Sequence, residues 1–285
     1  MSAPCAGDPP APEEPSERHQ ADGHHPPVDY DVRYKGGWAY GKAPDPFLAR
    51  AAAEFLPPGA AVVSLGEGQG RHAVHLAERG HPCLAVDLSP VGLRKSALLA
   101  EQRGVAHRVT TLVADLATFD PPPCPWGDDT NNRWGAIISV FCALPPATRR
   151  ALHRRCLARL APGGVVILVC FAPGHAAVRG AATSMAARCG PVDPAFLASA
   201  RDVVRDFTGT SGTVPGGGAG ALGGGTKEDS GSGADGTPAA GAFVAGDLST
   251  GAVEVLHCEE ERRFLRAGKF VRGDGLVTQV VIRKR

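Results

Sequence analysis

Three glycines and one aspartate carry the chemistry that this sequence suggests. Gly66, Gly68 and Gly70 directly follow the apolar run of residues 60–65 and precede a stretch with helical periodicity. Asp87 ends the next apolar run. A strand, a helix and a second strand would return Asp87 to the glycine loop at the carboxyl edge of a parallel sheet, where α/β proteins bind ligands. The pattern therefore predicts a site for a small molecule that contains a nucleoside.

The glycine spacing distinguishes two classes of nucleoside cofactor. A dinucleotide-binding loop reads G-x-G-x-x-G, and its third glycine would fall where Arg71 stands. A pyrophosphate needs bare amides at a helix N-terminus, whereas S-adenosylmethionine has no phosphate and needs a backbone that it can approach closely. We therefore expect S-adenosylmethionine, with Asp87 accepting hydrogen bonds from the ribose hydroxyls. The alternative is a strand-helix-strand unit whose glycines serve packing alone.

Composition limits the class of protein. The 285 residues are 43% hydrophobic and 21% charged, which is enough for one substantial core. The net charge is +1 and no basic patch is interleaved with aromatics, so we expect no nucleic-acid partner. No apolar run reaches the ~18 residues of a membrane span, and the N-terminus resembles neither a secretory signal nor a transit peptide. Eight cysteines without a CxxC pair favour reduced thiols, and we expect a soluble, cytoplasmic protein without a metal site.

Apolar runs alternate with helical patterns and predict an α/β fold: a seven-stranded, mostly parallel Rossmann-like sheet with helices on both faces and a C-terminal antiparallel hairpin. We expect residues 1–29 to form a disordered tail and residues 30–285 one domain, with a Gly-rich disordered insertion at 209–241. Expected strands are 61–65, 83–87, 109–113, 135–140, 165–171, 253–266 and 275–283. Expected helices are 70–79, 90–103, 146–160, closed by the Pro-Gly-Gly at 162–164, and one near 194–207.

Five short strings resemble the seven-stranded class I methyltransferases that use S-adenosylmethionine, and are most similar to the branch of tellurite-resistance and thiopurine methyltransferases that act on small molecules. They are LGEGQGR at 65–71, AVDLSP at 85–90, ADL at 114–116, SVFC at 139–142 and LAPGG at 160–164. The resemblance covers residues 30–208 and 253–285.

By position, the resemblance implies that Gly66, Gly68 and Gly70 line the methionine part of the cofactor and that Asp87 holds the ribose. Asp115 would face the adenine amino group, with Leu116 against the ring. A solvated turn aspartate is the alternative for Asp115. The cofactor-binding positions also include Glu67, Arg71, Leu88 and Phe141.

The chain departs from the family at two positions. Ser64 stands where relatives usually have an acid, so the contact to the cofactor's amino group would pass to Glu67 or to water. Glu67 could instead point into solvent. Ala143 stands where relatives of this branch often have a histidine before Leu-Pro, so if that imidazole helps to bind substrate, this chain lacks the contact.

Methyl transfer is a direct displacement, so the protein supplies mainly position and a dry pocket and needs no catalytic dyad. Phe141, Cys142 and Tyr40 are weak catalytic candidates: Phe141 could exclude water or merely pack, and Cys142 is more readily read as an apolar filler than as a nucleophile. Tyr40 and Trp38 could close over the cofactor. Arg33 or Arg71 could contact the substrate or the cofactor's carboxylate. For the histidines at 72, 75 and 153 we expect packing or solvent roles.

Three functions are consistent with these residues. The first is methyl transfer to a small-molecule acceptor, such as a thiol or a tellurium or selenium species. The second is an NAD-dependent oxidoreductase, which Arg71 and the terminal hairpin disfavour. The third is a binding module that keeps the methyltransferase fold without turnover, suggested by Ser64, Ala143 and the insertion. The acceptor and the oligomeric state stay open.

Overall fold

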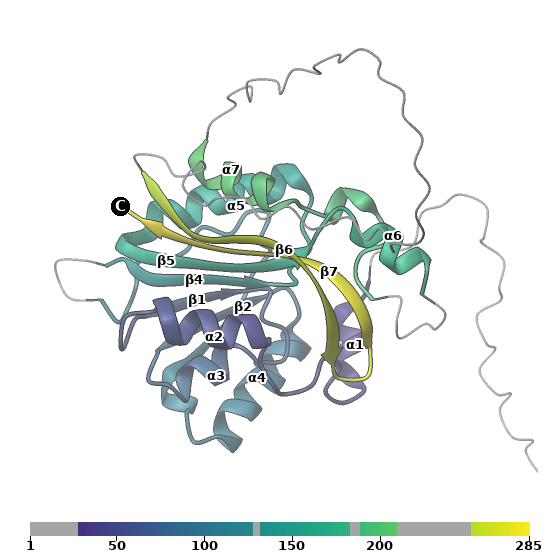
Figure 1. The fold of residues 1–285 in the computed structure, drawn as a ribbon. Helices are drawn as coiled ribbons and strands as arrows, with labels where there is room; N and C mark the ends of the chain where they lie inside the picture. Colours follow the sequence, from purple (N-terminus) through teal and green to yellow (C-terminus); the bar gives the residue numbers. More distant parts are fainter. Residues whose placement is uncertain (1–27, 128–131, 183–188, 210–251) are drawn as a thin grey trace, which may run out of the picture.

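The structure is a computed structural model that describes residues 28–127, 132–182, 189–209 and 252–285 (Figure 1). The expected tail, except Val28 and Asp29, and the expected insertion, except Gly209, lie outside these residues. Their disorder and the domain boundaries therefore stay predictions.

Seven strands form one sheet in the order β3-β2-β1-β4-β5-β7-β6. The first five strands pair in parallel, and β7 runs antiparallel to both β5 and β6. The predicted fold class is confirmed, including the terminal hairpin. The strands are β1 (Val62–Leu65), β2 (Cys83–Asp87), β3 (Val109–Val113), β4 (Trp134–Val140), β5 (Leu160–Phe171), β6 (Val253–Ala267) and β7 (Val271–Lys284).

Helices cover both faces of the sheet. Figure 1 shows α5 and α7 above it and α2, α3 and α4 below it. The helices are α1 (Tyr30–Lys35), α2 (Pro46–Phe55), α3 (Ala73–Ala77), α4 (Pro90–Gln102), α5 (Pro146–Arg159), α6 (His175–Gly180) and α7 (Ala200–Thr208), with short 3₁₀ turns at Ala106–Arg108 and Pro194–Phe196.

Several boundaries differ from expectation; β7, for example, begins at Val271 rather than at residue 275, and three further differences have a clear physical cause. The helix expected over 70–79 is only α3, because the chain turns at the left-handed Gly70 and Gly80 on either side of it. The helix expected near 194–207 begins only at Ala200, because Ser199 caps it through the amide of Asp202. The Pro-Gly-Gly at 162–164 lies inside β5, where the register against β4 jumps before Val165.

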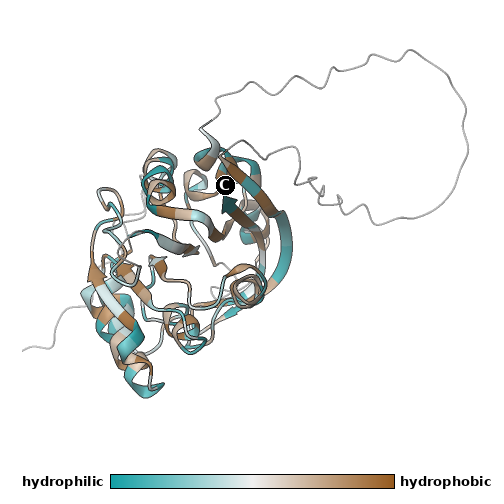
Figure 2. Cartoon of the chain, turned by 90° about the vertical axis from the view of Figure 1, so that its left-hand side faces the viewer, coloured by the Kyte–Doolittle hydropathy of each residue, from teal (hydrophilic) through white to brown (hydrophobic). Residues whose placement is uncertain are grey.

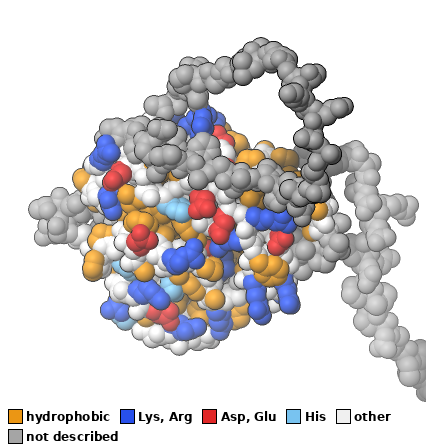
Figure 3. Space-filling view, in the orientation of Figure 1, with side chains coloured by type: hydrophobic (Ala, Val, Ile, Leu, Met, Phe, Trp, Pro, Cys, Tyr) orange, Lys and Arg blue, Asp and Glu red, His pale blue; other side chains and the backbone are white. Residues whose placement is uncertain are grey.

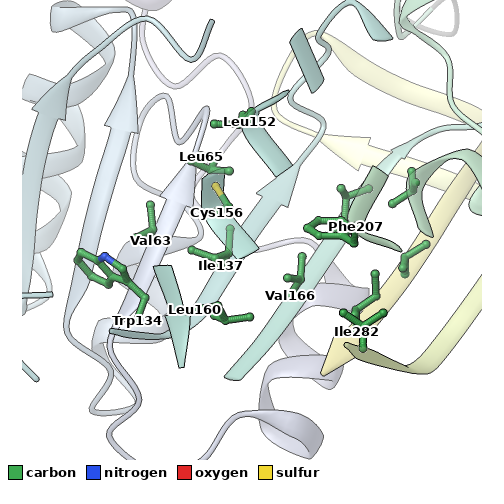
Figure 4. Packing of buried hydrophobic residues seen from close by; sticks show 14 of the residues in the cluster. Val63, Leu65, Trp134, Ile137, Leu152, Cys156, Leu160, Val166, Phe207 and Ile282 are labelled. Atoms are coloured by element: carbon green, nitrogen blue, oxygen red, sulfur yellow. The ribbon is translucent and has the colours of Figure 1, made fainter. Parts of the chain in front are cut away.

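Alternating side chains of the strands build two core layers. Successive residues of a strand point to opposite faces, so Val63 packs on the side of α5 and α7, and Val62 on the side of α2, α3 and α4. Figure 4 shows the first layer, in which Leu152 of α5 and Phe207 of α7 lie over the strands. In Figure 2 the helices carry both hydrophilic (teal) and hydrophobic (brown) residues, as expected for amphipathic helices on a sheet.

A buried charge cluster joins α5 to α7. The Arg149 Nε donates to Asp206 Oδ2 at 2.6 Å, and the His153 Nδ1 lies 3.2 Å from the same oxygen. The His153 ring also stacks on Phe207 with centroids 4.5 Å apart. Burial would raise the pKa of Asp206, but the interactions with His153 and Arg149 outweigh it and lower that pKa. The carboxylate therefore stays ionised and holds α7 against α5.

We predict that Asp206→Ala lowers the free energy of unfolding by about 3–5 kcal/mol, because it leaves Arg149 buried without its counter-charge. The measurement is urea unfolding followed by circular dichroism. Asp120→Ala is the matched control, since it removes a carboxylate that pairs with Arg159 at 2.9 Å on the surface, and it should cost less than about 1 kcal/mol. Equal losses in the two variants would contradict a stabilising role for the buried cluster.

Candidate functional site

The loop between β1 and α3 has a backbone that favours glycine. Gly66, Gly68 and Gly70 have φ angles of 63°, 62° and 93°, all in the left-handed region. The Gly68 amide donates to Asp87 Oδ2 at 2.7 Å, so the loop is tied to the end of β2. The structure thus brings the predicted glycines and the predicted aspartate together at one edge of the sheet.

The glycines are needed for a reason that differs from the expected one. A Cβ at Gly66 would lie 2.7 Å from the Cys142 sulfur, one at Gly68 would lie 2.6 Å from the Tyr34 hydroxyl, and one at Gly70 would lie 2.6 Å from the hydroxyl of Ser96 in α4. We expected bare backbone for a cofactor to approach. Here side chains of the protein itself approach it, and at Gly70 the contact is helix packing.

Asp87 is buried, and both of its carboxylate oxygens accept backbone hydrogen bonds. Oδ2 accepts from Gly68, and Oδ1 accepts from the Ser89 amide at 2.8 Å. Burial raises the pKa of Asp87, and the two backbone hydrogen bonds oppose that rise. Each oxygen keeps a second lone pair, so the carboxylate can still accept from a diol at this edge.

Glu67 is turned inward, so the expectation that it could point into solvent is wrong. Its Oε1 accepts from the amides of His72 and Ala73 at 2.9 and 3.1 Å, and its Oε2 accepts from the Ser64 hydroxyl. Free amides at the start of α3 and a positive helix end favour a carboxylate there. Burial raises the pKa of Glu67, and the hydrogen bonds oppose this. Ser64 therefore serves as the hydrogen-bond partner of Glu67.

The N-terminal segment lies over the glycine loop. Asp31 of α1 accepts from the Ser89 hydroxyl and from the Val91 amide at 3.4 Å, at the start of α4. Lys95 of α4 donates to the Tyr34 and Gly37 carbonyls, the latter at 2.7 Å. These contacts hold the ring of Tyr34, which is 5% exposed, against Gly68.

Gln69 completes the attachment of this segment. Its Oε1 accepts from the Ala39 amide at 2.7 Å, and its Nε2 donates to the Gly37 carbonyl at 2.7 Å. The sequence patterns did not reveal Gln69, Tyr34, Asp31 or Lys95. An amide side chain among three glycines was the available signal for Gln69, but its partners are about 30 residues away and could not be read from spacing.

Tyr40 and Trp38, both expected to close over the site, point to different places. The Tyr40 hydroxyl accepts from Arg33 Nη1 at 2.8 Å, and its ring lies 6.2 Å from Phe270 at the tip of the β6–β7 hairpin. Trp38 packs instead on the outer side of α3 and α4, with the Lys42 ammonium 4.4 Å from its ring. The expectation for Trp38 is therefore wrong. Tyr40 joins the N-terminal segment to the hairpin.

Arg71 lies next to the loop and is partly buried. Burial lowers the pKa of its guanidinium, and the carboxylates of Asp45 and Glu67 oppose this. Asp45 itself receives a hydrogen bond from Arg263 at 2.8 Å. Within the described part of the chain, no residue accepts a hydrogen bond from Arg71, so its donors are available to an anion.

The other predicted cofactor positions lie at the rim beyond Asp87. Leu88 is 68% exposed, which is unusual for a leucine beside a buried strand end. Asp115 is exposed and accepts from the Ala117 amide at 2.8 Å, while Leu116 is buried in the core layer of α5 and α7. Asp115 is therefore the turn aspartate of its loop, and it still has an oxygen to offer.

Phe141 directly follows β4 and has a φ of 55°, and among the described residues it alone combines a side chain with a positive φ. Such conformations are strained and gather at functional sites. Its ring lies 4.9 Å from that of Phe171. Burial raises the pKa of the neighbouring Cys142 thiol to about 12, which fits an apolar filler better than a nucleophile.

The histidines singled out from the sequence are buried. His72, His75 and His153 are 4%, 9% and 3% exposed, which confirms packing rather than solvent exposure. Burial lowers the pKa of His75 to about 4. The described residues contain no group of three side chains that could hold a metal ion. In the same residues no helix is long and apolar enough to cross a membrane.

Part of this chain is similar in sequence to known methyltransferases. Residues 62–164 match the family described as a methyltransferase domain. The 2-heptyl-1-hydroxyquinolin-4(1H)-one methyltransferase of Mycobacteroides abscessus is 31% identical over 112 residues, which are 39% of this chain and 45% of that protein. The match thus spans less than half of the curated relative.

Two solved structures share the fold along most of the chain. One comes from work on the conversion of a disulfide bond into a thioacetal group during echinomycin biosynthesis, with a TM-score of 0.57 and 18% identity over 90% of both chains. The other is TehB from Haemophilus influenzae, with a TM-score of 0.54 and 14% identity over 90% of this chain and 67% of that one. At these identities they show the fold alone.

The resemblance to class I methyltransferases is thus confirmed. For residues 62–164 the predicted enzyme class, a methyltransferase, is also confirmed, and S-adenosylmethionine as its cofactor stays a prediction. The individual site residues stay predictions, supported by the geometry above.

We predict that Gly66→Ala destabilises the protein by about 2–5 kcal/mol. The left-handed backbone costs about 1–2 kcal/mol for a residue with a Cβ, and the new methyl group must displace Cys142 at about 1–3 kcal/mol more. Gly59→Ala is the matched control, because Gly59 has a φ of 72° but nothing within 4 Å of the position that a Cβ would occupy. Urea unfolding of both variants measures the difference. If the two lose equal stability, Cys142 does not constrain the loop.

Proposed function

We propose that this chain, which carries a methyltransferase domain at residues 62–164, transfers a methyl group from S-adenosylmethionine to a small-molecule acceptor. One observation carries the proposal: a left-handed glycine loop, the Asp87 carboxylate and the Arg71 guanidinium lie together at the carboxyl edge of the sheet. The glycine loop suits the methionine part of that cofactor, Asp87 suits its ribose and Arg71 suits its carboxylate.

The residues present fit the cofactor as follows. Asp87 accepts from the ribose hydroxyls through its remaining lone pairs. Arg71 binds the cofactor's carboxylate, which supplies the counter-charge that its buried guanidinium needs. Leu88 and Leu116 pack on the adenine ring, which would cover the exposed Leu88 side chain. Asp115 accepts from the adenine amino group. Because Tyr34 reaches Gly68, we expect α1 to shift outward when the cofactor binds.

Bound S-adenosylmethionine supplies a sulfonium whose methyl group is already activated for displacement. The chain then contributes position and exclusion of water, which can be worth ~7–11 kcal/mol. The Phe141 amide donates a hydrogen bond to the Val169 carbonyl at 2.7 Å, which holds Phe141 at the end of β4. Phe141 and the N-terminal aromatic rings close the site against water.

Titratable side chains around Phe141 are poor bases. Burial raises the pKa of Cys142 to about 12 and that of Tyr30 to about 12, and it raises the pKa of Tyr34 as well. The lone pairs of Asp87 that the Gly68 and Ser89 amides leave free are taken by the ribose hydroxyls in this proposal. The acceptor must therefore be nucleophilic without losing a proton to a base of the protein. Thiols and reduced tellurium or selenium species meet this requirement, since they ionise near neutral pH.

The curated relative supports a small-molecule acceptor, since it is the methyltransferase of a hydroxyquinolone. The surface agrees with this: on the face shown in Figure 3, basic and acidic side chains are interspersed and form no single-sign patch for a polyanion. A binding module without turnover is the second candidate. The observation that favours it is the Tyr34 ring, which lies against the loop that the cofactor would use.

We predict that Arg71→Met and Asp87→Ala each weaken S-adenosylmethionine binding by about 1–3 kcal/mol, because each removes a charge-assisted hydrogen bond. Isothermal titration calorimetry measures the affinities. Arg94→Met is the matched control, since Arg94 is an exposed arginine of α4, and its affinity should equal that of the wild type. Wild-type affinity in the Asp87 variant would remove this residue from the site.

We predict that the full-length protein transfers labelled methyl from S-adenosylmethionine to at least one member of a panel of aryl and alkyl thiols, selenide and telluride. Because the described side chains around Phe141 offer no good base, the pH at which the rate is half-maximal should follow the pKa of each thiol rather than stay fixed. A pH midpoint common to all thiols would instead reveal a protein base. Binding of the cofactor without transfer to any acceptor, including a cell extract, would favour the module.

A further inference from the structure

Aromatic contacts lead from the candidate site to a buried histidine. The centroid of the Phe171 ring lies 4.9 Å from that of Phe141 and 4.4 Å from that of His175. Phe171 is the last residue of β5, and β5 is parallel to β4, so Phe171 stands at the same edge of the sheet as Phe141. Phe171 is 8% exposed and His175 is 0% exposed. The Phe171 ring therefore connects Phe141, next to the glycine loop, with a fully buried imidazole.

Both ring nitrogens of His175 have hydrogen-bond partners. The Leu276 amide lies 3.3 Å from Nδ1, and because an amide can only donate, Nδ1 is the acceptor. Nε2 then carries the hydrogen of the neutral ring and donates to the Cys189 carbonyl at 2.8 Å. Burial lowers the pKa of His175, which favours this neutral form. The imidazole is thus held in one tautomer and one orientation between β7 and the segment at residue 189.

The backbone packs closely on these rings. A Cβ at Gly190 would lie 2.8 Å from His175 Nε2 and 3.1 Å from Phe171 Cε2. Gly190 has a φ of 85°, which favours glycine at this close approach. Helix α6, which begins at His175, packs in turn on β7 (Figure 1). The His175 and Phe171 rings therefore share one tight contact with the chain, and a shift of either ring would disturb the other.

Phe141 needs support from its surroundings because its backbone is strained. A side-chain-bearing residue with a φ of 55° persists only where the structure around it holds it in place. Its amide donates to the Val169 carbonyl at 2.7 Å, which fixes the backbone but leaves the ring free to turn. The ring itself rests against Phe171. The place of the Phe141 ring consequently depends on Phe171 and on the imidazole that packs against Phe171.

We propose that His175 is a positioning residue of this enzyme, which holds the Phe141 ring at the reacting centre through Phe171. The inference rests on the proposed function for the role of Phe141, whereas the three ring contacts do not depend on it. In the described part of the chain, His175 forms its hydrogen bonds with Ala172, Cys189 and Leu276 and none with the glycine loop. Its replacement should therefore affect methyl transfer far more than cofactor binding.

The first test is fluorine NMR of the full-length protein labelled with 4-fluorophenylalanine. The resonance that disappears in Phe141→Leu belongs to Phe141. His175→Leu removes the ring and both hydrogen bonds at similar side-chain size, and it should shift or split the Phe141 resonance.

His81→Leu is the matched control. His81 is also buried, and its Nδ1 lies 3.1 Å from the Ala60 carbonyl, but it precedes β2 and so lies at the opposite edge of the sheet. This variant should leave the Phe141 resonance where it is in the wild type. Circular dichroism establishes that each variant is folded. If His175→Leu does not fold, His175→Gln, which can keep one hydrogen bond but has no ring, replaces it in both tests.

The second test is the rate of labelled methyl transfer from S-adenosylmethionine to benzenethiol, together with calorimetric titration of S-adenosylmethionine. His175→Leu should lower kcat about tenfold or more, because a small displacement near the reacting atoms is costly. Its affinity for S-adenosylmethionine should stay within about threefold of the wild type, which is less than 1 kcal/mol. His81→Leu should resemble the wild type in both measurements.

An unchanged Phe141 resonance in a folded His175 variant overturns the proposal. So does an equal shift in His81→Leu, which would mean that the loss of any buried histidine loosens Phe141. A shifted resonance with an unaltered kcat also overturns it, because the ring position would then not matter for the reaction. A wild type that transfers methyl to no acceptor contradicts the proposed function instead, and the fluorine spectra alone then decide whether His175 holds Phe141.

Discussion

The left-handed backbone of the glycine loop is the constraint on which the rest of the site depends. Because Gly66, Gly68 and Gly70 all have positive φ, the chain leaves β1, reverses tightly and enters α3 within a few residues. The Gly68 amide then meets Asp87, and the α3 amides meet Glu67. Two buried carboxylates are thereby satisfied by backbone donors, which offsets the cost of their burial.

Segments far apart in the sequence close over this loop. The N-terminal α1 is fixed to α4 by Asp31 and Lys95, and the tip of the β6–β7 hairpin holds the following segment, where a Cβ at Gly268 would lie 2.2 Å from the Ala39 carbonyl. The Lys269 amide donates to the same carbonyl at 3.2 Å. The terminal hairpin therefore extends the sheet and also holds the segment that lies over the glycine loop.

The sequence was sufficient for the sheet and for the Gly68–Asp87 pair, because periodicity and strand ends determine both locally. It did not predict how the N-terminal segment lies over the glycine loop. Tyr34 and Gln69 act through partners that only the tertiary fold brings near, and Trp38 could not be distinguished from Tyr40 because both are aromatics in one turn-rich segment. The solvent alternative for Glu67 was wrong because a loop carboxylate looks solvated until the short α3 behind it is known to need a cap.

Calorimetric titration of the unmodified, full-length protein with S-adenosylmethionine and, separately, with NAD tests the central claim most directly. The account predicts saturable one-to-one binding of S-adenosylmethionine and no binding of NAD. Binding of NAD together with no heat from S-adenosylmethionine would contradict it, because the glycine loop, Asp87 and Arg71 would then serve a different nucleotide.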